Sequence, residues 1–400
     1  MGKFKADSMG TKVTIFLAGF ALMADMAIYP AAESMFNDFP NASVPLLNFV
    51  LTGTSLMIIF ASIVCGILAQ FISKKLILIA SYTVFLISAF ATGYLDSASS
   101  MAVMRAITGI SMGFIGTIMI SIISQIYINE KTRSAVLGVY NGIMAALGAI
   151  ISFIAGYLAV NDWHLIFTIY LFAIPIIILS YIFIPSTPPV KEEVQGDTEP
   201  NAVFPMGRVL ATTFAAFVIN AIYAVILTMV SVYLAEQQIG DASTAGIMGS
   251  VGTLGSFLAG MTFVFFYDRF KYFMPVIFSL FMAIGYAIMS VSMNTVVIGL
   301  MCVLLGCCYG MSYSYYLMHS SVIVSPSKAS LSIGFATAGI YVGLFSGPYV
   351  PMAYQYIFDL STIAQTMPYL AGTSLIFCIV ATYIALRNRQ KDAAAATAAH

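Results

Sequence analysis

Charged side chains are scarce in this sequence. Asp, Glu, Lys and Arg make up 8% of the 400 residues, about a third of the share usual in soluble proteins, whereas hydrophobic residues make up 60%. So little charge could not cover the surface of a soluble globule of this length, and we expect lipid to be the solvent for most of the chain. The formal net charge is +0, which argues against nucleic acid as a partner.

The sequence also lacks the motifs of several enzyme and pump classes. It contains no nucleotide-binding loop, no metal-ligand cluster and no nucleophile arrangement, so we expect neither an enzyme nor an ATP-driven transporter, and no cofactor or metal. Its five cysteines all lie in apolar stretches, where a thiol acts as a small hydrophobe.

Long apolar stretches dominate what is present. A bilayer core needs about 20 apolar residues per helix, and the chain supplies twelve such stretches. The predicted spans are 12–36, 44–69, 76–95, 99–126, 134–160, 163–184, 207–235, 243–267, 273–293, 296–319, 329–356 and 363–386. The sequence therefore predicts an all-α integral membrane protein with twelve transmembrane helices. The lengths of 134–160 and 329–356 predict that these two helices are tilted.

The positive charges are distributed unevenly among the gaps. Fifteen of the sixteen Lys and Arg residues lie in alternate gaps, and the sixteenth, Arg105, lies inside the fourth stretch. The other gaps carry acidic residues, such as Asp38, Asp96 and Asp162. Because cytoplasmic loops retain Lys and Arg, we expect both termini on the cytoplasmic side.

The chain divides at a polar segment into two halves. Residues 185–206 contain five prolines and four acidic residues, which predicts a solvated cytoplasmic linker. It separates an N-terminal six-helix bundle, 1–184, from a C-terminal one, 207–391. The alanine-rich residues 392–400 are interpreted as an appended tail.

The two halves also share a pattern in their fourth helices. Arg105-x3-Gly109-x3-Gly113 in the first half matches Cys302-x3-Gly306-x3-Gly310 in the second. Repeated six-helix halves in a membrane protein favour a transporter that rocks around a central site.

The gap after the second helix keeps Gly66, Leu68, Lys74 and Lys75 of a known loop signature, but has Gln70 in place of its acid and Ser73 in place of its second glycine. The fourth helix reads Met101-x3-Arg105-Ala106-Ile107-Thr108-Gly109, similar to a known arginine signature. Both segments resemble signatures of the major facilitator superfamily, within it the branch of drug:proton antiporters. The glycine-rich fifth helix lacks the Gly-Pro pair of those antiporters, whereas the eleventh carries Gly343-x3-Gly347-Pro348.

The resemblance implies roles for named residues. It implies conformational gating by Gly66, Gln70, Lys74 and Lys75, and by the second-half equivalents Asp268 and Arg269. It implies proton coupling for Arg105, and a cavity lined by the first, fourth, seventh and tenth helices.

Candidate partners of Arg105 lie on the first helix. A cation within hydrocarbon costs at least ~2.5 kcal/mol, so Arg105 should face a wet cavity or a partner. Asp25 and Glu33 lie on either side of Pro30, which should bend the helix, and the side chain of Arg105 could reach toward either acid. We rank Asp25 first as the proton carrier, with a permanent salt bridge to Arg105 as its alternative. Glu33 could instead be an exposed rim residue, and Arg105 could instead clamp backbone carbonyls.

Substrate-binding candidates come from the predicted cavity helices. Tyrosine rings offer stacking surface with a hydroxyl handle, although an aromatic stripe can equally be packing. The candidates are Arg105, Tyr29, Asn220, Tyr223, Tyr309, Tyr313 and Tyr316.

The sequence thus predicts a secondary active transporter of a small organic solute that works by alternating access. The leading version is proton-coupled export of amphipathic or aromatic compounds by a monomer in the cell membrane, the inner membrane of a bacterium. One alternative is an organic-anion uniporter or symporter in which Arg105 binds the substrate carboxylate. Another is a transporter-like receptor that transports nothing.

Overall fold

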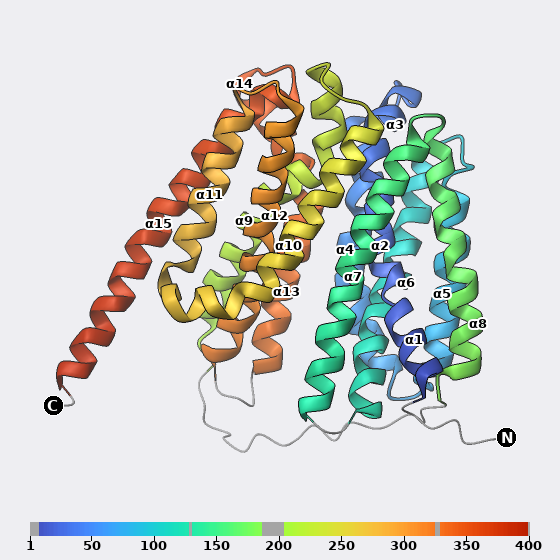
Figure 1. Ribbon diagram of the computed structural model, residues 1–400, viewed down its shortest axis with the longest axis horizontal. Helices are drawn as coiled ribbons and strands as arrows, with labels where there is room; N and C mark the ends of the chain where they lie inside the picture. The colour runs from blue at the N-terminus through green and yellow to red at the C-terminus, as the bar shows by residue number, and fades with distance from the viewer. Residues whose placement is uncertain (1–7, 128–129, 186–203, 325–328, 399–400) are drawn as a thin grey trace. The chain divides into compact units, whose positions relative to one another are not determined.

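Helices form all of the regular structure in the part of the chain that is described. The computed structural model describes residues 8–127, 130–185, 204–324 and 329–398 (Figure 1). Contacts divide the chain into two compact units. Unit 1 comprises Met1–Thr198 with Asp241–Ser250, and unit 2 comprises Glu199–Gly240 with Val251–His400. The predicted all-α class is confirmed. Most of the predicted linker, and Lys3, Lys5, Lys191 and Lys328 of the predicted charge pattern, lie outside the described residues.

The elements of the first half follow the predicted spans. They are α1 (Met9–Leu17), α2 (Phe20–Ala24), η1 (Asp25–Ala27), η2 (Tyr29–Ala31), α3 (Ala32–Asp38), α4 (Val44–Leu68), α5 (Lys74–Thr92), α6 (Ala98–Ile126), α7 (Glu130–Ala159), η3 (Trp163–Phe172) and α8 (Ala173–Phe183). Here α denotes an α-helix and η a 3₁₀ helix.

The second half has a similar series. It comprises α9 (Met206–Glu236), α10 (Ala242–Phe270), η4 (Lys271–Phe273), α11 (Met274–Met289), α12 (Thr295–Val322), α13 (Ala329–Ser346), α14 (Tyr349–Phe358) and α15 (Ile363–Ala398). The predicted tail from residue 392 continues α15 as far as Ala398.

Length and hydropathy give ten membrane-spanning helices in the described residues, or eleven with one bent pair. The stretch 242–289 counts once in that total, although its 48 residues are about twice the length needed for one crossing. Lys271 has φ 40° in the short turn that separates α10 from α11, and Figure 1 shows the chain reversing there. Each of the twelve predicted stretches therefore coincides with helical structure.

Two predicted helices are interrupted. The first span passes through two 3₁₀ turns at Asp25–Ala27 and Tyr29–Ala31, next to Pro30, which has no backbone N–H to donate. The predicted single tilted helix over 329–356 is wrong, because α13 and α14 meet at an angle of 58°. The break falls at Gly347-Pro348, where proline cannot continue the helical hydrogen bonding.

The predicted internal repeat is visible in matched hydrogen bonds. In unit 1, the Tyr82 hydroxyl donates to the Ala18 carbonyl at 2.6 Å, and the two residues are 64 positions apart. In unit 2, the Tyr286 hydroxyl donates to the Ile222 carbonyl at 2.6 Å, again across 64 positions. Each bond joins the third helix of its half to the first, so the two halves repeat one arrangement.

The two glycine pairs found in the sequence also occupy equivalent positions in the two halves. Gly109 and Gly113 of α6 lie against the backbone of α4, and Gly306 and Gly310 of α12 lie against that of α10. The Ser256 hydroxyl on α10 donates to the Gly306 carbonyl at 2.9 Å. Small residues let helix backbones approach closely in a membrane, so these glycines serve the packing of each half.

Two hydrogen bonds fix the start of η3. The Asp162 carboxylate accepts from the backbone N–H of His164 at 2.9 Å, and the Trp163 indole N–H donates to Asp38. The hydrogen bond from the His164 backbone, with the His164 ring 2.7 Å away, lowers the pKa of Asp162. The cap is therefore present at neutral pH and is lost as the pH falls through this lowered value.

Gly109→Ala should destabilise the protein. The added Cβ would lie 2.6 Å from both the Cα and the carbonyl oxygen of Thr54, and backbone atoms can move aside only by separating α6 from α4. We expect a loss of roughly 1–3 kcal/mol and a lower melting temperature in lipid nanodiscs. The control is Gly372→Ala, since no atom lies within 4 Å of a Cβ at Gly372. Equal melting temperatures for the two variants would contradict the close approach of α4 and α6.

Candidate functional site

A buried ion pair joins α6 to the first span in unit 1. The Arg105 guanidinium on α6 donates through Nη2 to the Asp25 carboxylate Oδ1, and the two groups form a salt bridge. Arg105 is 0% exposed and Asp25 is 7% exposed. The structure thus brings Arg105 to the acid ranked first in the sequence.

The Asp25 carboxylate accepts two further hydrogen bonds. The Thr54 hydroxyl donates to Oδ2 at 2.8 Å, and the Tyr29 hydroxyl donates to the same oxygen at 3.3 Å. Thr54 lies on α4, whereas Asp25 and Tyr29 lie in the successive 3₁₀ turns of the first span. An ionised carboxylate can only accept, so this surrounding matches the charged form of Asp25.

Two backbone carbonyls of α4 hold the other side of Arg105. Its Nε donates to the Val50 carbonyl at 2.8 Å and its Nη2 to the Leu51 carbonyl at 3.2 Å. The predicted clamp on backbone carbonyls and the predicted pairing with an acid are therefore both present. The remaining nitrogen, Nη1, is buried and has no hydrogen-bond partner among the described residues.

Glu33 is separate from this pair in its hydrogen bonding. It lies on α3, is partly exposed, and accepts from the Asn37 side chain one turn further along the same helix.

The described residues of unit 2 carry no equivalent of the ion pair. Cys302, the residue matched to Arg105 by the glycine pattern, is buried. None of the buried side chains that the structure describes in unit 2 is charged. The buried charged side chains among the described residues therefore lie in unit 1.

Three of the predicted tyrosines lie together in unit 2. The rings of Tyr223 on α9 and Tyr309 on α12 stack with centroids 4.4 Å apart and an interplanar angle of 12°. Tyr313 lies one turn from Tyr309, with ring centroids 6.1 Å apart, and is exposed. This cluster offers flat aromatic surface and hydroxyl groups without charge.

Two other predicted binding residues lie elsewhere in unit 2. Tyr316 is buried against the ring of Phe278, 5.9 Å away between centroids. Asn220 is fully buried, donates to the Ala216 carbonyl at 2.7 Å, and packs against Gly343 of α13.

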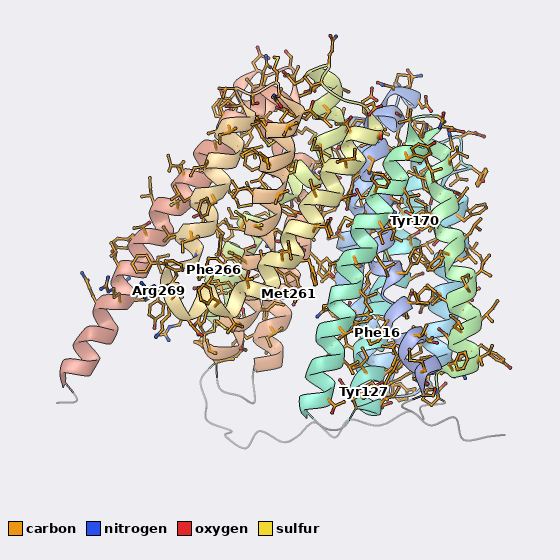
Figure 2. All side chains as sticks on the ribbon, in the orientation of Figure 1. Phe16, Tyr127, Tyr170, Met261, Phe266 and Arg269 are labelled. Carbon is orange, nitrogen blue, oxygen red and sulfur yellow. The ribbon has the colours of Figure 1, made fainter. Side chains whose placement is uncertain are left out.

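The predicted gating residues lie at helix ends. Gly66 and Gln70 are exposed, and Asp268 and Arg269 are exposed in the last turn of α10, where Figure 2 labels Arg269. Lys74 is buried, and the Lys75 ammonium donates to the Tyr181 carbonyl of α8 at 2.7 Å.

Two neighbours of the ion pair were absent from the sequence prediction. Thr54 binds Asp25, and Tyr170 of η3 interacts electrostatically with both Asp25 and Arg105. Nothing in the local sequence distinguishes them, because hydroxyl side chains are common in the apolar stretches and only folding brings these two to the pair.

Comparisons with known proteins agree on one fold. The family pattern described as Major Facilitator Superfamily matches residues 14–348. No curated protein gives a significant match. A mutant of the nucleoside transporter NupG is similar over 93% of this chain and 99% of its own, with 14% identity and a TM-score of 0.76. The xylose transporter XylE from E. coli, in an inward-open conformation, is similar over 92% of this chain and 94% of its own, with 15% identity and a TM-score of 0.71. The human organic anion transporter MFSD10 is similar over 93% of this chain and 99% of its own, with 12% identity and a TM-score of 0.65. At these identities the likeness shows the fold alone.

Removing one member of the ion pair should cost more than removing both. Asp25→Ala leaves the fully buried Arg105 cation without its counter-ion, and we expect a loss of roughly 3–5 kcal/mol in the free energy of unfolding. Asp25→Ala combined with Arg105→Met removes both charges and should recover part of that loss. Thermal unfolding in nanodiscs of the wild type, both single variants and the double variant measures the coupling. Strictly additive losses would mean that the two charges do not stabilise one another.

Proposed function

This chain belongs to the Major Facilitator Superfamily, and we propose that it couples the transport of a small organic solute to protons through Asp25. The fold is that of secondary transporters, which move a small solute across the membrane without being enzymes. The proposal adds the coupling ion, the residue that carries it and the class of solute.

The single observation that supports proton coupling is the environment of Asp25. Its carboxylate is held by Arg105, Thr54 and Tyr29, all of which favour the charged form. A proton on Asp25 would cancel the salt bridge and leave a buried cation, so the protonated and ionised forms favour different arrangements of the first span and α6. The 3₁₀ turns next to Pro30 give the first span a place at which to adjust.

The uncharged tyrosine cluster of unit 2 supports a solute with a flat, neutral surface. Tyr223 and Tyr309 already stack on one another, and a planar ring could extend that stack by packing on Tyr309, which is partly exposed, with hydroxyl groups as polar contacts. Amphipathic or aromatic compounds fit this description. The similar solved structures include transporters of nucleosides and of xylose, and both classes of solute belong in a first screen.

The same observations weigh against the organic-anion alternative. A substrate carboxylate could bind Arg105 only by displacing Asp25 or opening the bundle, because the guanidinium is 0% exposed. The direction of transport, predicted to be export, rests on the resemblance to drug:proton antiporters. The location in a bacterial inner membrane, the cytoplasmic termini and the monomeric state belong to the same proposal.

Proton flux triggered by the solute tests the coupling. Proteoliposomes that contain the dye pyranine would receive uridine, xylose or an aromatic cation, and the internal pH would be followed. We expect at least one solute to move protons through the wild type, and Asp25→Asn to abolish that movement because the amide cannot carry a proton.

The matched control for this assay is Asp359→Asn. Asp359 is exposed and has φ 54°, a conformation that Asn accepts readily, so the variant should behave as the wild type. Full proton movement in Asp25→Asn would exclude Asp25 as the carrier. Absence of flux for every solute in a broad screen would favour the receptor alternative.

The stacking surface predicts a second result. Tyr309→Leu removes the ring that faces Tyr223, whereas Tyr309→Phe keeps it. For an aromatic solute we expect KM to rise about tenfold in Tyr309→Leu, corresponding to roughly 1–3 kcal/mol of stacking, and much less in Tyr309→Phe. An equal KM for Tyr309→Leu and the wild type would remove this surface from the binding site.

A further inference from the structure

Thr54 makes a different hydrogen bond from other buried threonines of the chain. Within a helix, a threonine hydroxyl can donate to the backbone carbonyl four residues back. Thr52 and Thr228 do so, at 3.1 and 2.7 Å. Thr54 is also buried within a helix, α4, but its hydroxyl donates at 2.8 Å to Oδ2 of Asp25. Because a hydroxyl has one proton, Thr54 cannot donate to the Val50 carbonyl, four residues back, at the same time.

The Val50 carbonyl is held by Arg105 instead. Within α4 this carbonyl accepts the backbone N–H of Thr54, which leaves it one lone pair. Nε of Arg105 donates to it at 2.8 Å. The Thr54 hydroxyl and Nε of Arg105 therefore compete for one acceptor. In this structure Asp25 takes the hydroxyl, and the carbonyl is left to Arg105.

A proton on Asp25 would reverse the hydrogen bond from Thr54. Arg105 binds Oδ1, so Oδ2 is the oxygen at which a proton can bind without displacing the guanidinium. The O–H formed there must donate to an acceptor. Thr54 is the closer of the two hydroxyl groups bonded to Oδ2, at 2.8 Å against 3.3 Å for Tyr29, and a hydroxyl accepts as well as donates. Once Thr54 accepts, its own proton needs another acceptor.

We propose that Thr54 is a positioning residue that transmits the protonation of Asp25 to Arg105 through the Val50 carbonyl. A proton from water binds Oδ2 of Asp25, and the O–H formed donates to Oγ1 of Thr54. The Thr54 hydroxyl turns to the Val50 carbonyl, as the hydroxyl of Thr52 does to its own, and Nε of Arg105 leaves that carbonyl. The new O–H is the only covalent bond formed. This inference rests on the proposed proton coupling through Asp25.

The exchange would connect protonation to the packing of α6 against α4. Arg105 is bonded to α4 through the carbonyls of Val50 and Leu51. Gly109, one turn further along α6, lies against the backbone of Thr54. Release of Nε leaves the Leu51 carbonyl to hold Arg105 on α4. Proton uptake would therefore free α6 to move relative to α4 and the first span, which is the kind of movement that alternating access requires.

The other titratable groups that act on the ion pair are tyrosines. Tyr29 of η2 and Tyr170 of η3 interact electrostatically with both Asp25 and Arg105. The remaining element in contact with the pair, α4, contributes Thr54, which does not titrate. Both tyrosines are unchanged in every variant compared below, so differences among these variants come from Asp25 and Thr54.

The Nε group of Arg105 can be observed without knowing the substrate. Solid-state NMR of the full chain in lipid, with ¹⁵N-labelled arginine, detects the Nε resonances, and that of Arg105 is the one that Arg105→Lys removes. Its position depends on whether the N–H has an acceptor. Asp25→Asn takes the place of the protonated acid, because the amide is neutral and donates an N–H where the acid would donate its O–H.

The expected pattern is not additive. In the wild type and in Thr54→Val the resonance should have one position, because nothing competes for the Val50 carbonyl. In Asp25→Asn it should move, because the Thr54 hydroxyl takes that carbonyl. Adding Thr54→Val to Asp25→Asn should restore the wild-type position, whereas adding Thr54→Ser, which keeps the hydroxyl, should not. Adding Thr228→Val is the matched control and should not restore it either, because Thr228 is equally buried, at 1% exposure, but lies in unit 2.

Failure of this inference differs from failure of the proposed function. If Asp25→Asn leaves the Nε resonance unmoved, or if Thr54→Val does not reverse the movement, Thr54 does not have this role, and proton binding by Asp25 is unaffected. In the pyranine assay Thr54→Val should slow proton movement about tenfold, the effect of one hydrogen bond, and Thr54→Ser should not. A wild-type rate in Thr54→Val would also contradict the inference. Full proton movement in Asp25→Asn would instead overturn the proposed function.

Discussion

The arrangement of unit 1 depends on pairing the hydrogen-bond donors of one cation that is buried away from water. Arg105 is the eighth residue of α6 and is 0% exposed, and an unpaired guanidinium there would be very costly. Its donors are met by a carboxylate from the first span and two carbonyls from α4, so three helices are tied together by one side chain. The glycines of α6 contribute to the same contact, because Gly109 allows α4 to approach within one turn of Arg105.

The two halves have one architecture and different chemistry. The matched hydrogen bonds of Tyr82 and Tyr286, each across 64 residues, show how closely the backbones repeat. At the position of Arg105 the second half has Cys302, and its buried described residues carry no charge. The buried charges among the described residues are thus confined to one half, while the other offers aromatic surface. Such a division would let proton binding and solute binding use different groups.

Several features could be predicted from the residue order because each depends on local chemistry. The apolar stretches gave the helices, Pro30 indicated the irregular first span, and an arginine within hydrocarbon required a partner, which proved to be Asp25. The bend at Gly347-Pro348 was missed, although the signal was present, because a long apolar stretch was interpreted as one tilted helix. Asn220 was predicted to bind substrate because its helix is expected to line the cavity, and Tyr316 because of its helical spacing. The neighbours that their side chains contact, Ala216 and Phe278, were decided by packing.

The sequence by itself determined the class of protein, the spans and the cation that lies within one of them, because hydrophobicity and charge act within each segment. Only the tertiary structure decided which groups surround that cation. Thr54 and Tyr170 are 29 and 145 residues from Asp25 along the chain, and neither belongs to a recognisable motif. They reach the pair because α4 and η3 pack against the elements that carry it, and that packing is set by side-chain shapes throughout the bundle. The placement of Thr54 and Tyr170 beside the ion pair is therefore a property of the folded chain.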